Sequence, residues 1–527
     1  MNSDKSEDIS NNSLERDNDT FMEERQPTPH QKVAAAANDD SSATPVYGDG
    51  QMNSSSHEKQ QTSPVRQPLA PLQGPLGQHP QQHVSFFSKE YKPHRLQIHK
   101  RFVLINTLMA TLILTALSIY WGSYYNINDN LKELKMLVVI GDENTIDGIP
   151  PAFGNAMEEV LQRPQSKASG DWHIFKESEF KQLAEDHDNT IRGEIIRRVH
   201  HQLYWAAIYV KPNASYNYHQ ALVNGDTKYN ASDNTVAVYY ETGRDSTIIG
   251  LYVLPQIQKI EKLWFNKLPV LTARIVDITI QSKAQKLVLT QPLLFTVFDG
   301  APYSQYILNA PLQIGIIQLI MVSFFQFNFF ASPHQKVAQS PVKRAHYVVY
   351  RYISSLLSFC FFSLIFGLVS LAYQADFTST FGKSGFLVYW GITFLTMCAV
   401  GFANEIMALL IIPIYPPLLG YWLVFWVIIN VAPSYNAMSL TNNFYRYGYA
   451  TPMYNGYEAT KVIFFDLYKG NLGRNIGILI AWIVVLSMAF PFALTRFNTL
   501  SNNRAATIEP KECSSGTNSE EMKQEGR

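Results

Sequence analysis

The chain contains very little cysteine, only three residues in 527, and few charged residues, 16% of the total, with a formal net charge of zero. Cys360 and Cys398 lie in apolar stretches, and Cys513 lies near the end of the chain. Neither a disulfide framework nor a cysteine-rich metal site is therefore expected. The net charge is zero, and no region combines a basic surface with a fold signature of nucleic-acid binding, so nucleic acid is excluded as a partner.

Signatures of catalysis are missing as well, since the sequence contains neither HExxH nor GxSxG. A Gly-Lys-Ser triplet occurs at residues 382–384, but a phosphate loop needs another glycine five residues earlier, where Phe377 stands. His200 and His201 are adjacent, so on a helix they point about 100° apart, unlike the i, i+4 pair of a zinc helix. We expect no catalytic residue, no metal, no cofactor and no enzymatic activity.

Long apolar stretches are what the sequence has in abundance. A helix needs about 20 apolar residues to cross a hydrocarbon core. The uncharged stretches are 102–125, 301–335, 352–375 and 475–495, and Glu405 is the only charge between 384 and 445. Three prolines within residues 413–417 divide that last stretch into two helices. Six spans are predicted, and the fifth, which ends near Pro433, is the shortest.

Basic residues indicate how these spans are oriented. They dominate the segment before the first span and the loop between the second and third spans, which places both segments in the cytoplasm. With six spans, both termini are then cytoplasmic, and the plasma membrane is the expected location. The basic residues are Lys89, Lys92, Arg95, Lys100 and Arg101, followed by Lys336, Lys343, Arg344 and Arg351.

The predicted fold class is an α-helical multi-pass membrane protein with a mixed α/β extracytoplasmic domain between spans one and two. That domain has roughly 180 residues, enough for a core of its own. The polar composition of the two ends predicts disorder. The predicted segments are a disordered cytoplasmic tail (1–90), a first span (101–125), the α/β domain (126–304), a five-span membrane domain (305–496) and a second disordered cytoplasmic tail (497–527).

Apolar runs within the α/β domain predict four strands, LKMLVVI, YWAAIYV, TVAVYY and PLLFTVF. Helical patterns cover residues 191–203 and 245–264, the second bent at Pro255. Asn213 and Asn230 begin Asn-Ala-Ser triplets, which are N-glycosylation acceptors in a lumenal domain. Asn213 or Ser215 is also suited to the N-cap of a helix.

Glu405, preceded by Asn404, is a carboxylate within a predicted span, where an ionisable group is costly and usually faces the bundle interior or water. The functional interpretation is a polar lining or proton-sensitive group on a translocation path. The structural interpretation is a protonated or paired carboxylate. A water-accessible path beside Glu405 favours the first, and a fully packed bundle favours the second.

The segment NNFYRYGYATPMYNGYE, residues 442–458, contains five tyrosines. Tyrosine prefers the membrane interface, so this segment, including Tyr447, is predicted to cap the bundle at the outer surface. Gly448 permits close backbone approach, Pro452 favours a break, and Arg446 can pair with Glu458, a phosphate or a tyrosine ring. An amphipathic stretch that follows is expected to lie in the interface. The segment is interpreted either as a structural plug or as a cargo contact.

FYRYGYATPMYN followed by IFFDLYKGNLGRNIGIL, together with one span, a large outer domain and five further spans, resembles the fungal nitrosoguanidine-resistance protein family. More distantly, the chain resembles the phage-infection type of bacterial membrane protein and the permease subunits of type-2 ABC exporters. The resemblance covers roughly residues 90–500. It implies a role in drug export or in the membrane properties that govern drug entry. The permeases use an ATPase partner, and this chain has no phosphate loop.

Two functional hypotheses follow. The first is a transporter-like protein that confers resistance to toxic small molecules by export or by altering membrane lipid distribution. The second is a non-transporting scaffold or regulator that acts through its outer domain or tails. The expected partners are the lipid bilayer, amphipathic small molecules or lipids, and a protein partner or a second copy of the chain.

Overall fold

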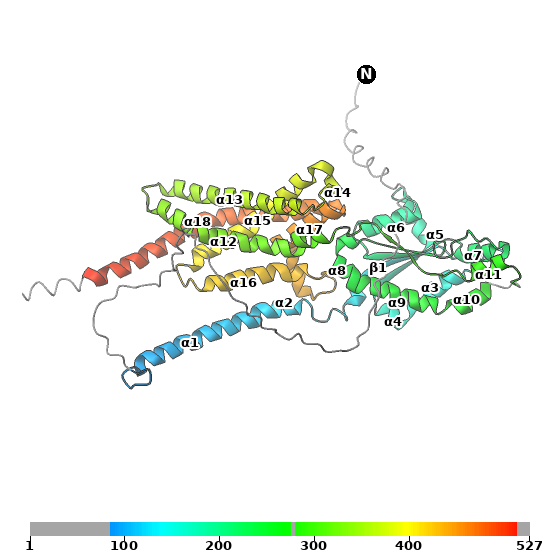
Figure 1. Ribbon diagram of the computed structural model, residues 1–527, viewed down its shortest axis with the longest axis horizontal. Helices are drawn as coiled ribbons and strands as arrows, with labels where there is room; N and C mark the ends of the chain where they lie inside the picture. The colour runs from blue at the N-terminus through cyan, green and yellow to red at the C-terminus, as the bar shows by residue number, and fades with distance from the viewer. Residues whose placement is uncertain (1–84, 276–279, 514–527) are drawn as a thin grey trace, which may run out of the picture. The chain divides into compact units, whose positions relative to one another are not determined.

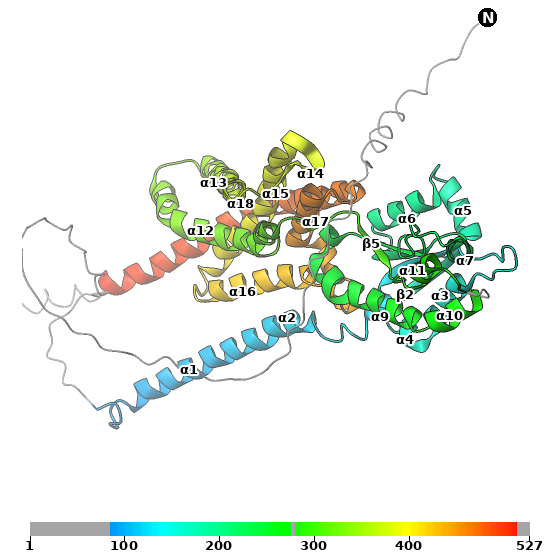
Figure 2. The ribbon, with the colours of Figure 1, turned by 45° about the vertical axis from the view of Figure 1, so that its right-hand side comes forward.

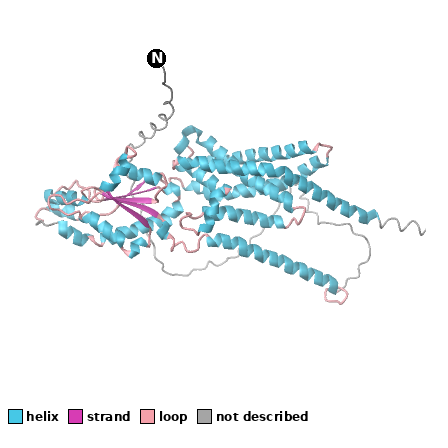
Figure 3. Cartoon of the chain, turned by 180° about the vertical axis from the view of Figure 1, so that it is seen from behind, coloured by secondary structure: helices cyan, strands magenta, loops and turns pink. Residues whose placement is uncertain are grey.

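The structure is a computed structural model that describes residues 85–275 and 280–513. Most of the two expected polar tails, residues 1–84 and 514–527, lies outside the described residues. The described part consists of an α/β domain and a set of long helices (Figure 1; Figure 3).

A five-stranded mixed sheet forms the centre of the α/β domain, with strand order β2-β1-β3-β4-β5. β1 is parallel to β2 and β3, β4 is antiparallel to β3, and β5 is parallel to β4. The register places Val138 opposite Ile208, which lies opposite Val238. The strands are β1 (Lys135–Ile140), β2 (Asp171–Lys176), β3 (Ala206–Val210), β4 (Val236–Tyr240) and β5 (Thr296–Asp299).

The four predicted strands are present as β1, β3, β4 and β5. β2, with the sequence DWHIFK, was missed. It lies at an edge of the sheet, and both of its end residues, Asp171 and Lys176, are exposed. An edge strand tolerates polar residues, and β2 has them at three of its six positions, so unlike β5 at the other edge it contains no long apolar run.

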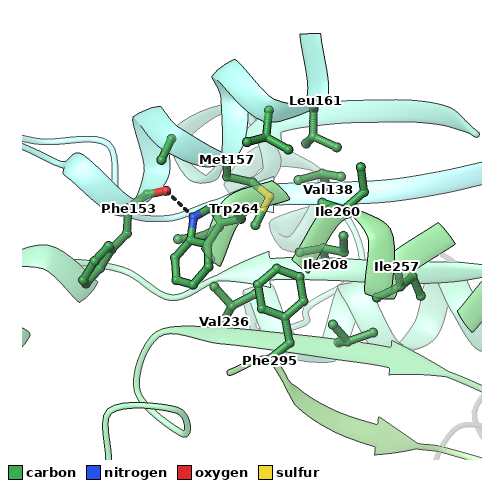
Figure 4. Close-up of a cluster of buried hydrophobic side chains, with 14 of the residues drawn as sticks. Val138, Phe153, Met157, Leu161, Ile208, Val236, Ile257, Ile260, Trp264 and Phe295 are labelled. Carbon is green, nitrogen blue, oxygen red and sulfur yellow. Dashed lines mark hydrogen bonds between the residues drawn. The ribbon is translucent and has the colours of Figure 1, made fainter. Parts of the chain in front are cut away.

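Helices cover both faces of the sheet, because the side chains of successive strand residues point to opposite faces. Val138 and Ile208 belong to one core with α3, α7 and α9, and Figure 4 shows Trp264 of α9 there, donating from Nε1 to the carbonyl of Phe153 at 3.3 Å. Leu137 belongs to the other core, with α5 and α6. The helices are α3 (Ala152–Gln162), α4 (Pro164–Lys167), α5 (Glu177–Glu185), α6 (Ile191–His200), α7 (Ala214–Asn224), α8 (Ser246–Ile248), α9 (Leu254–Phe265), α10 (Leu268–Ile275) and α11 (Lys283–Leu289).

Both predicted helices of this domain are present. α6 fills most of the range 191–203, and α8 continues into α9 through a π-helical turn at Ile249–Val253. This wide turn lies directly before Pro255, which has no N–H to donate to the preceding turn.

Asp142, which follows β1, joins the first turns of two helices. Its Oδ1 accepts from the backbone N–H of Ser215 at 3.0 Å, and its Oδ2 accepts from the N–H of Gly154 at 3.1 Å and from the Ser215 hydroxyl at 2.6 Å. The predicted helix start is confirmed, since Asn213 is the N-cap residue of α7. The Asn213 side chain makes no capping bond, however, and Asp142 accepts from the first turn instead. Asp142 thus lies just after the carboxyl end of a parallel strand, a common position for ligands, and bonds there to the protein's own backbone.

The membrane domain confirms a multi-pass membrane protein. Five described helices are long and apolar enough to cross a membrane, and Leu418–Ser434 is a shorter apolar helix. The sixth span therefore stays a prediction. The five are Lys92–Gly122, Tyr306–Gln339, Arg344–Ala372, Thr378–Ile411 and Lys469–Ser501. Their elements are α1 (Lys92–Leu112), α2 (Ser118–Gly122), α12 (Gly315–Gln339), α13 (Arg344–Ala372), α14 (Thr378–Phe381), α15 (Gly385–Ile411), α16 (Leu418–Val431), α17 (Pro452–Phe465) and α18 (Leu472–Cys513).

The predicted break at residues 413–417 is confirmed, since α15 ends at Ile411 and α16 begins at Leu418. Two helices extend beyond the predicted spans. α1 begins at Lys92, before the predicted start of the first span at 101, and α18 continues to Cys513, past the predicted end of the membrane domain at 496. Hydropathy marks only the part of a helix that matches hydrocarbon, whereas backbone hydrogen bonds continue the helix into polar sequence.

α15 lies at the centre of the bundle. In the helix that contains α15, 72% of the most apolar 18-residue stretch is buried inside the molecule, against 6% for the corresponding stretch of the first span. α17 is also internal rather than interfacial, because most of its residues are buried. It approaches α15 closely at Gly456, where an added Cβ would lie 2.4 Å from the Thr396 hydroxyl. Figure 2 shows α15, α17 and α18 side by side.

Candidate functional site

The α/β domain contacts the membrane domain through the loop that follows β4. Lys461 of α17 donates from Nζ to the carbonyl of Arg244 at 2.8 Å. Gly243 lies so close to α17 that an added Cβ would meet the Cβ of Phe465 at 2.4 Å. Glycine at 243 is therefore a requirement of this contact.

A second contact involves the segment between α16 and α17. Asn130 donates from Nδ2 to the carbonyl of Leu440 at 2.9 Å, and Asn436 donates to the carbonyl of Ser123 at 3.0 Å. Leu440 is fully buried within the core of the α/β domain. The two contacts lie on either side of a cavity.

This cavity, which we call the junction pocket, has a volume of about 440 Å³. Residues from five parts of the chain line it, and polar groups predominate. These parts are residues 133–135 around the start of β1, 201–205 before β3, 244–245 after β4, 433–439 after α16, and 449–474, which includes α17.

Arg244 is the most constrained charge of the junction pocket. Its guanidinium donates to the carbonyls of Tyr204 at 2.8 Å and Gln202 at 3.3 Å, and its Cζ lies 3.6 Å from the ring centroid of Trp205. Burial lowers the pKa of Arg244 to about 10, so the group remains charged at neutral pH. Among the described residues, no carboxylate lies within ion-pair distance of it.

Lys461, Glu458 and Asp245 also line the pocket. The Lys461 ammonium lies 2.7 Å from Glu458 Oε1 and 4.5 Å from the ring centroid of Tyr457. Asp245 Oδ1 accepts from the N–H of Ile248 at 2.9 Å and so caps α8, while burial raises the pKa of Asp245. Both acids are thus already engaged by partners within the protein.

The aromatic part of the lining comes from Trp205, Tyr449 and Tyr454. Burial raises the pKa of Tyr454, so its hydroxyl stays protonated. Arg474, at the start of α18, places its Cζ 5.8 Å from the ring centroid of Tyr449. Charged groups and flat apolar surfaces therefore line the same space, as suits an amphipathic ligand.

Of the residues predicted from the sequence, Glu405 and Asn404 lie away from the junction pocket, inside the bundle. Glu405 forms an ion pair with Arg351 of α13 and accepts from the Ser355 hydroxyl at 2.6 Å. Asn404 donates to Ser323 and accepts from Trp422 Nε1, both at 3.0 Å. Together they fasten α12, α13 and α16 to α15.

The aromatic segment is divided between several environments. Arg446 is exposed, whereas Glu458, the partner proposed for it, pairs with Lys461. Gly448 packs against Pro433, where an added Cβ would lie 2.3 Å from the proline ring. Pro452 is the first residue of α17.

Tyr449 is the most exposed of the five tyrosines, at 44%. Tyr445 is buried and donates to the carbonyl of Ile119 at 2.7 Å. The buried hydroxyl of Tyr447 has no hydrogen-bond partner among the described residues. The segment that was predicted to cap the bundle at the outer surface is therefore largely buried, and part of it lines the junction pocket.

Both candidate glycosylation residues, Asn213 and Asn230, are exposed on the α/β domain. His200 and His201 take separate partners: His200 Nδ1 lies 2.8 Å from Glu241 Oε1, and His201 stacks on Tyr468 at 4.3 Å. No group of three metal-ligating side chains occurs in the part of the chain that the structure describes.

Sequence reasoning missed Arg244, Lys461, Arg474 and Arg351. Lys461 was signalled by its place in an otherwise apolar stretch, and Arg474 lies within the segment that carries the family resemblance. Arg351 was taken for a loop residue because it precedes the uncharged run, yet it is buried within α13. Nothing in the sequence distinguishes Arg244 from a surface arginine.

The chain was compared with known proteins. Residues 105–488 match the family model described as "Protein of unknown function (DUF3533)". A relative from Saccharomyces cerevisiae, described as an uncharacterized endoplasmic reticulum membrane protein, is 32% identical over 461 residues, which covers 84% of this chain and 87% of the relative. No solved structure matches.

Proposed function

Because this chain belongs to the family described as "Protein of unknown function (DUF3533)" and has five helices able to cross a membrane, we propose that it is a transporter-like integral membrane protein. In this proposal it takes amphipathic molecules into the junction pocket and confers resistance to toxic compounds, by exporting them or by altering membrane lipid distribution. The resemblance to the nitrosoguanidine-resistance family supports this role. No catalytic step is part of the proposal.

The junction pocket is the observation that carries the proposal. Its volume of about 440 Å³ falls in the range of roughly 300–1,000 Å³ that small-molecule sites occupy. Its lining combines ammonium, guanidinium and carboxylate groups with Trp205 and two tyrosines. It also lies at the ends of membrane helices, where a molecule with a polar head and an apolar tail finds both environments.

The proposal includes a topology. With α16 counted as a sixth span, the basic segments place both termini in the cytoplasm and the α/β domain outside. α16 and the turn after it supply about 17 residues, or roughly 26 Å of helix, slightly less than the hydrocarbon thickness of about 30 Å. We propose the plasma membrane as the location. The yeast relative's description supports the endoplasmic reticulum instead, and imaging a tagged chain at native expression distinguishes the two.

The packing of Glu405 favours the second candidate function, a non-transporting scaffold or regulator. Its carboxylate is 1% exposed and is bonded to Arg351 and Ser355. A brace of this kind suits a bundle that stays closed. In that case the α/β domain or the tails act by binding a protein partner or a second copy of the chain.

Cellular accumulation tests the proposal. Null cells are compared with cells that carry wild type, Tyr454→Ala in the junction pocket, or Phe492→Ala as a matched aromatic control, 77% exposed on α18. The probes are a labelled toxic amphiphile and a short-chain fluorescent phospholipid, at equal protein levels. We expect wild type and Phe492→Ala to lower accumulation of one probe and Tyr454→Ala to lose that effect. Equal accumulation in all four strains would reject transport and favour the scaffold.

A further inference from the structure

The acidic and basic side chains of the junction pocket differ in whether they have partners within the protein. The half-buried Glu458 and the buried Asp245 already have partners, since Glu458 pairs with Lys461 and Asp245 caps α8. Three cationic side chains, in contrast, form no ion pair among the described residues. These cations are Lys135, Arg244 and Arg474.

Two further groups line the pocket without changing this balance. Glu133, Lys135 and Arg474 are all exposed, so solvent screens this one acid and these two bases alike, and the lining still has one base more than it has acids. Burial and the neighbouring Arg197 lower the pKa of His201, which is therefore neutral at pH 7. The pocket consequently presents an excess of positive charge to a ligand.

Arg244 gives this excess a defined geometry. A guanidinium has five N–H donors, and the carbonyls of Tyr204 and Gln202 take one each. Three N–H groups are left without a hydrogen bond to any described residue. Glu458 and Asp245 act on Arg244 electrostatically but lie beyond ion-pair distance. The Trp205 ring and the two carbonyls hold the guanidinium plane in place before a ligand arrives.

We propose that the junction pocket binds an oxyanion, of the phosphate or phosphate-ester class, through Arg244, with Arg474 and Lys135 supplying further positive charge. A planar guanidinium matches two oxygens of such a group at once. This inference rests on the proposed function, because it specifies the polar end of the amphipathic ligand. The pocket volume exceeds that of one phosphate, which leaves room beside Tyr454 for the group that the phosphate carries.

A cationic ligand fits less well, because Glu133, a lining carboxylate that forms no ion pair with a described residue, is exposed to solvent. Taking Glu458 would break the pair with Lys461, and taking Asp245 would remove the cap of α8. An anion breaks no bond within the protein. It also gives the buried guanidinium a partner at ion-pair distance, which no described carboxylate does.

Equilibrium binding to the full chain in phosphatidylcholine nanodiscs tests this inference. The probes are octyl phosphate, inorganic phosphate and octyltrimethylammonium, with uptake by empty nanodiscs subtracted. The variants are Arg244→Gln, Arg244→Lys and Arg474→Gln. Arg192→Gln is the matched control, because Arg192 also lies over aromatic rings in the α/β domain, without an ion pair, outside the pocket. Thermal unfolding of each variant separates lost binding from lost folding.

We expect octyl phosphate to bind more tightly than octyltrimethylammonium. Arg244→Gln should weaken it about tenfold to a hundredfold, Arg244→Lys less, and Arg474→Gln about threefold, with Arg192→Gln unchanged. Should Arg244→Gln unfold, the Arg474 variant carries the test. Equal or tighter binding of the cationic probe, or octyl phosphate binding that both arginine variants keep, overturns the oxyanion site.

The outcome also separates this inference from the proposed function. Inorganic phosphate that binds as tightly as octyl phosphate, with the same dependence on Arg244, supports the oxyanion site and rejects the amphipathic cargo. Tight binding of the cationic probe alone, lost in Tyr454→Ala, supports the amphipathic cargo and rejects the oxyanion. Binding of no probe rejects both.

Discussion

The buried ion pair between Arg351 and Glu405 gives a sharp prediction of stability. Both side chains are almost fully enclosed, with residue exposures of 2% and 1%. Removing one partner of such a pair strands the other charge and costs about 3–5 kcal/mol. Arg351→Met should therefore destabilise the bundle by about that amount, because the Glu405 carboxylate keeps only the Ser355 hydroxyl as a partner.

The second single variant should cost less. In Glu405→Gln the amide oxygen can replace Oε1 and still accept from Arg351, while Nε2 replaces Oε2 and donates to the Ser355 hydroxyl oxygen. One hydrogen bond to the Arg351 guanidinium is kept, so we expect a loss of about 1–3 kcal/mol, as for a weakened hydrogen bond to a charged group. The double variant, Arg351→Met with Glu405→Gln, buries no charge and should be more stable than Arg351→Met alone.

Unfolding of the purified full chain in one fixed detergent, followed by near-UV circular dichroism, measures these differences. Cellular accumulation is measured in parallel at matched protein levels. The reasoning is refuted if the double variant is less stable than Arg351→Met. Glu405→Gln that is as stable as wild type but loses the accumulation effect would refute the brace and restore the role of Glu405 on a translocation path.

Three further predictions concern other parts of the chain. Gly456→Val should lower the yield of folded protein in gel filtration, because the side chain would collide with Thr396, whereas Gly477→Val, with open space around it, should not. Burial lowers the pKa of His200, but the neighbouring Glu241 raises it by more, so the net pKa is raised. The contact between His200 and Glu241 therefore stabilises the fold fully below the usual His pKa of about 6.5, and this stabilisation is lost as the pH rises through the raised pKa. The free energy of unfolding of the wild type should be higher at pH 6 than at pH 8, and that of His200→Gln should not. A difference that persists in His200→Gln would show that another group causes it. If the α/β domain is outside, both candidate acceptor asparagines should add a glycosidase-sensitive mass on gels that their Gln variants lose, and an unchanged mobility of the wild type after glycosidase treatment would contradict this placement.

Hydropathy was sufficient to predict the five long membrane helices and four of the five strands, including β5 at the other edge of the sheet. Each of these elements contains a contiguous apolar run, so the pattern is local. The break at residues 413–417 was predictable for the same reason, since proline acts on its own backbone. β2 was not predictable, because its polar edge is stabilised by hydrogen bonds to β1, a partner 36 residues away in the register.

The candidate site was much less accessible to sequence reasoning. The junction pocket combines five separated parts of the chain, and no spacing rule connects Arg244 with Lys461 or Arg474. Arg351 illustrates the same difficulty, since its partner, Glu405, lies on another helix. Glu405 was identified as unusual because an acid within an apolar run is visible locally. Its partner was not identified, because a basic residue at the end of a run looks like any positive loop residue.

The burial of Leu440 in the core of the α/β domain has a consequence for how the protein is made. The last strand of that domain ends at Asp299, yet one of its core side chains is supplied by the segment after α16. A ribosome that adds about 5–20 residues per second needs about 7 to 28 seconds to cover the intervening stretch of about 140 residues. During that interval the newly translated domain exposes an apolar gap, which a chaperone would have to shield. Nonsense mutations between these two points should therefore leave an aggregation-prone domain that quality control degrades.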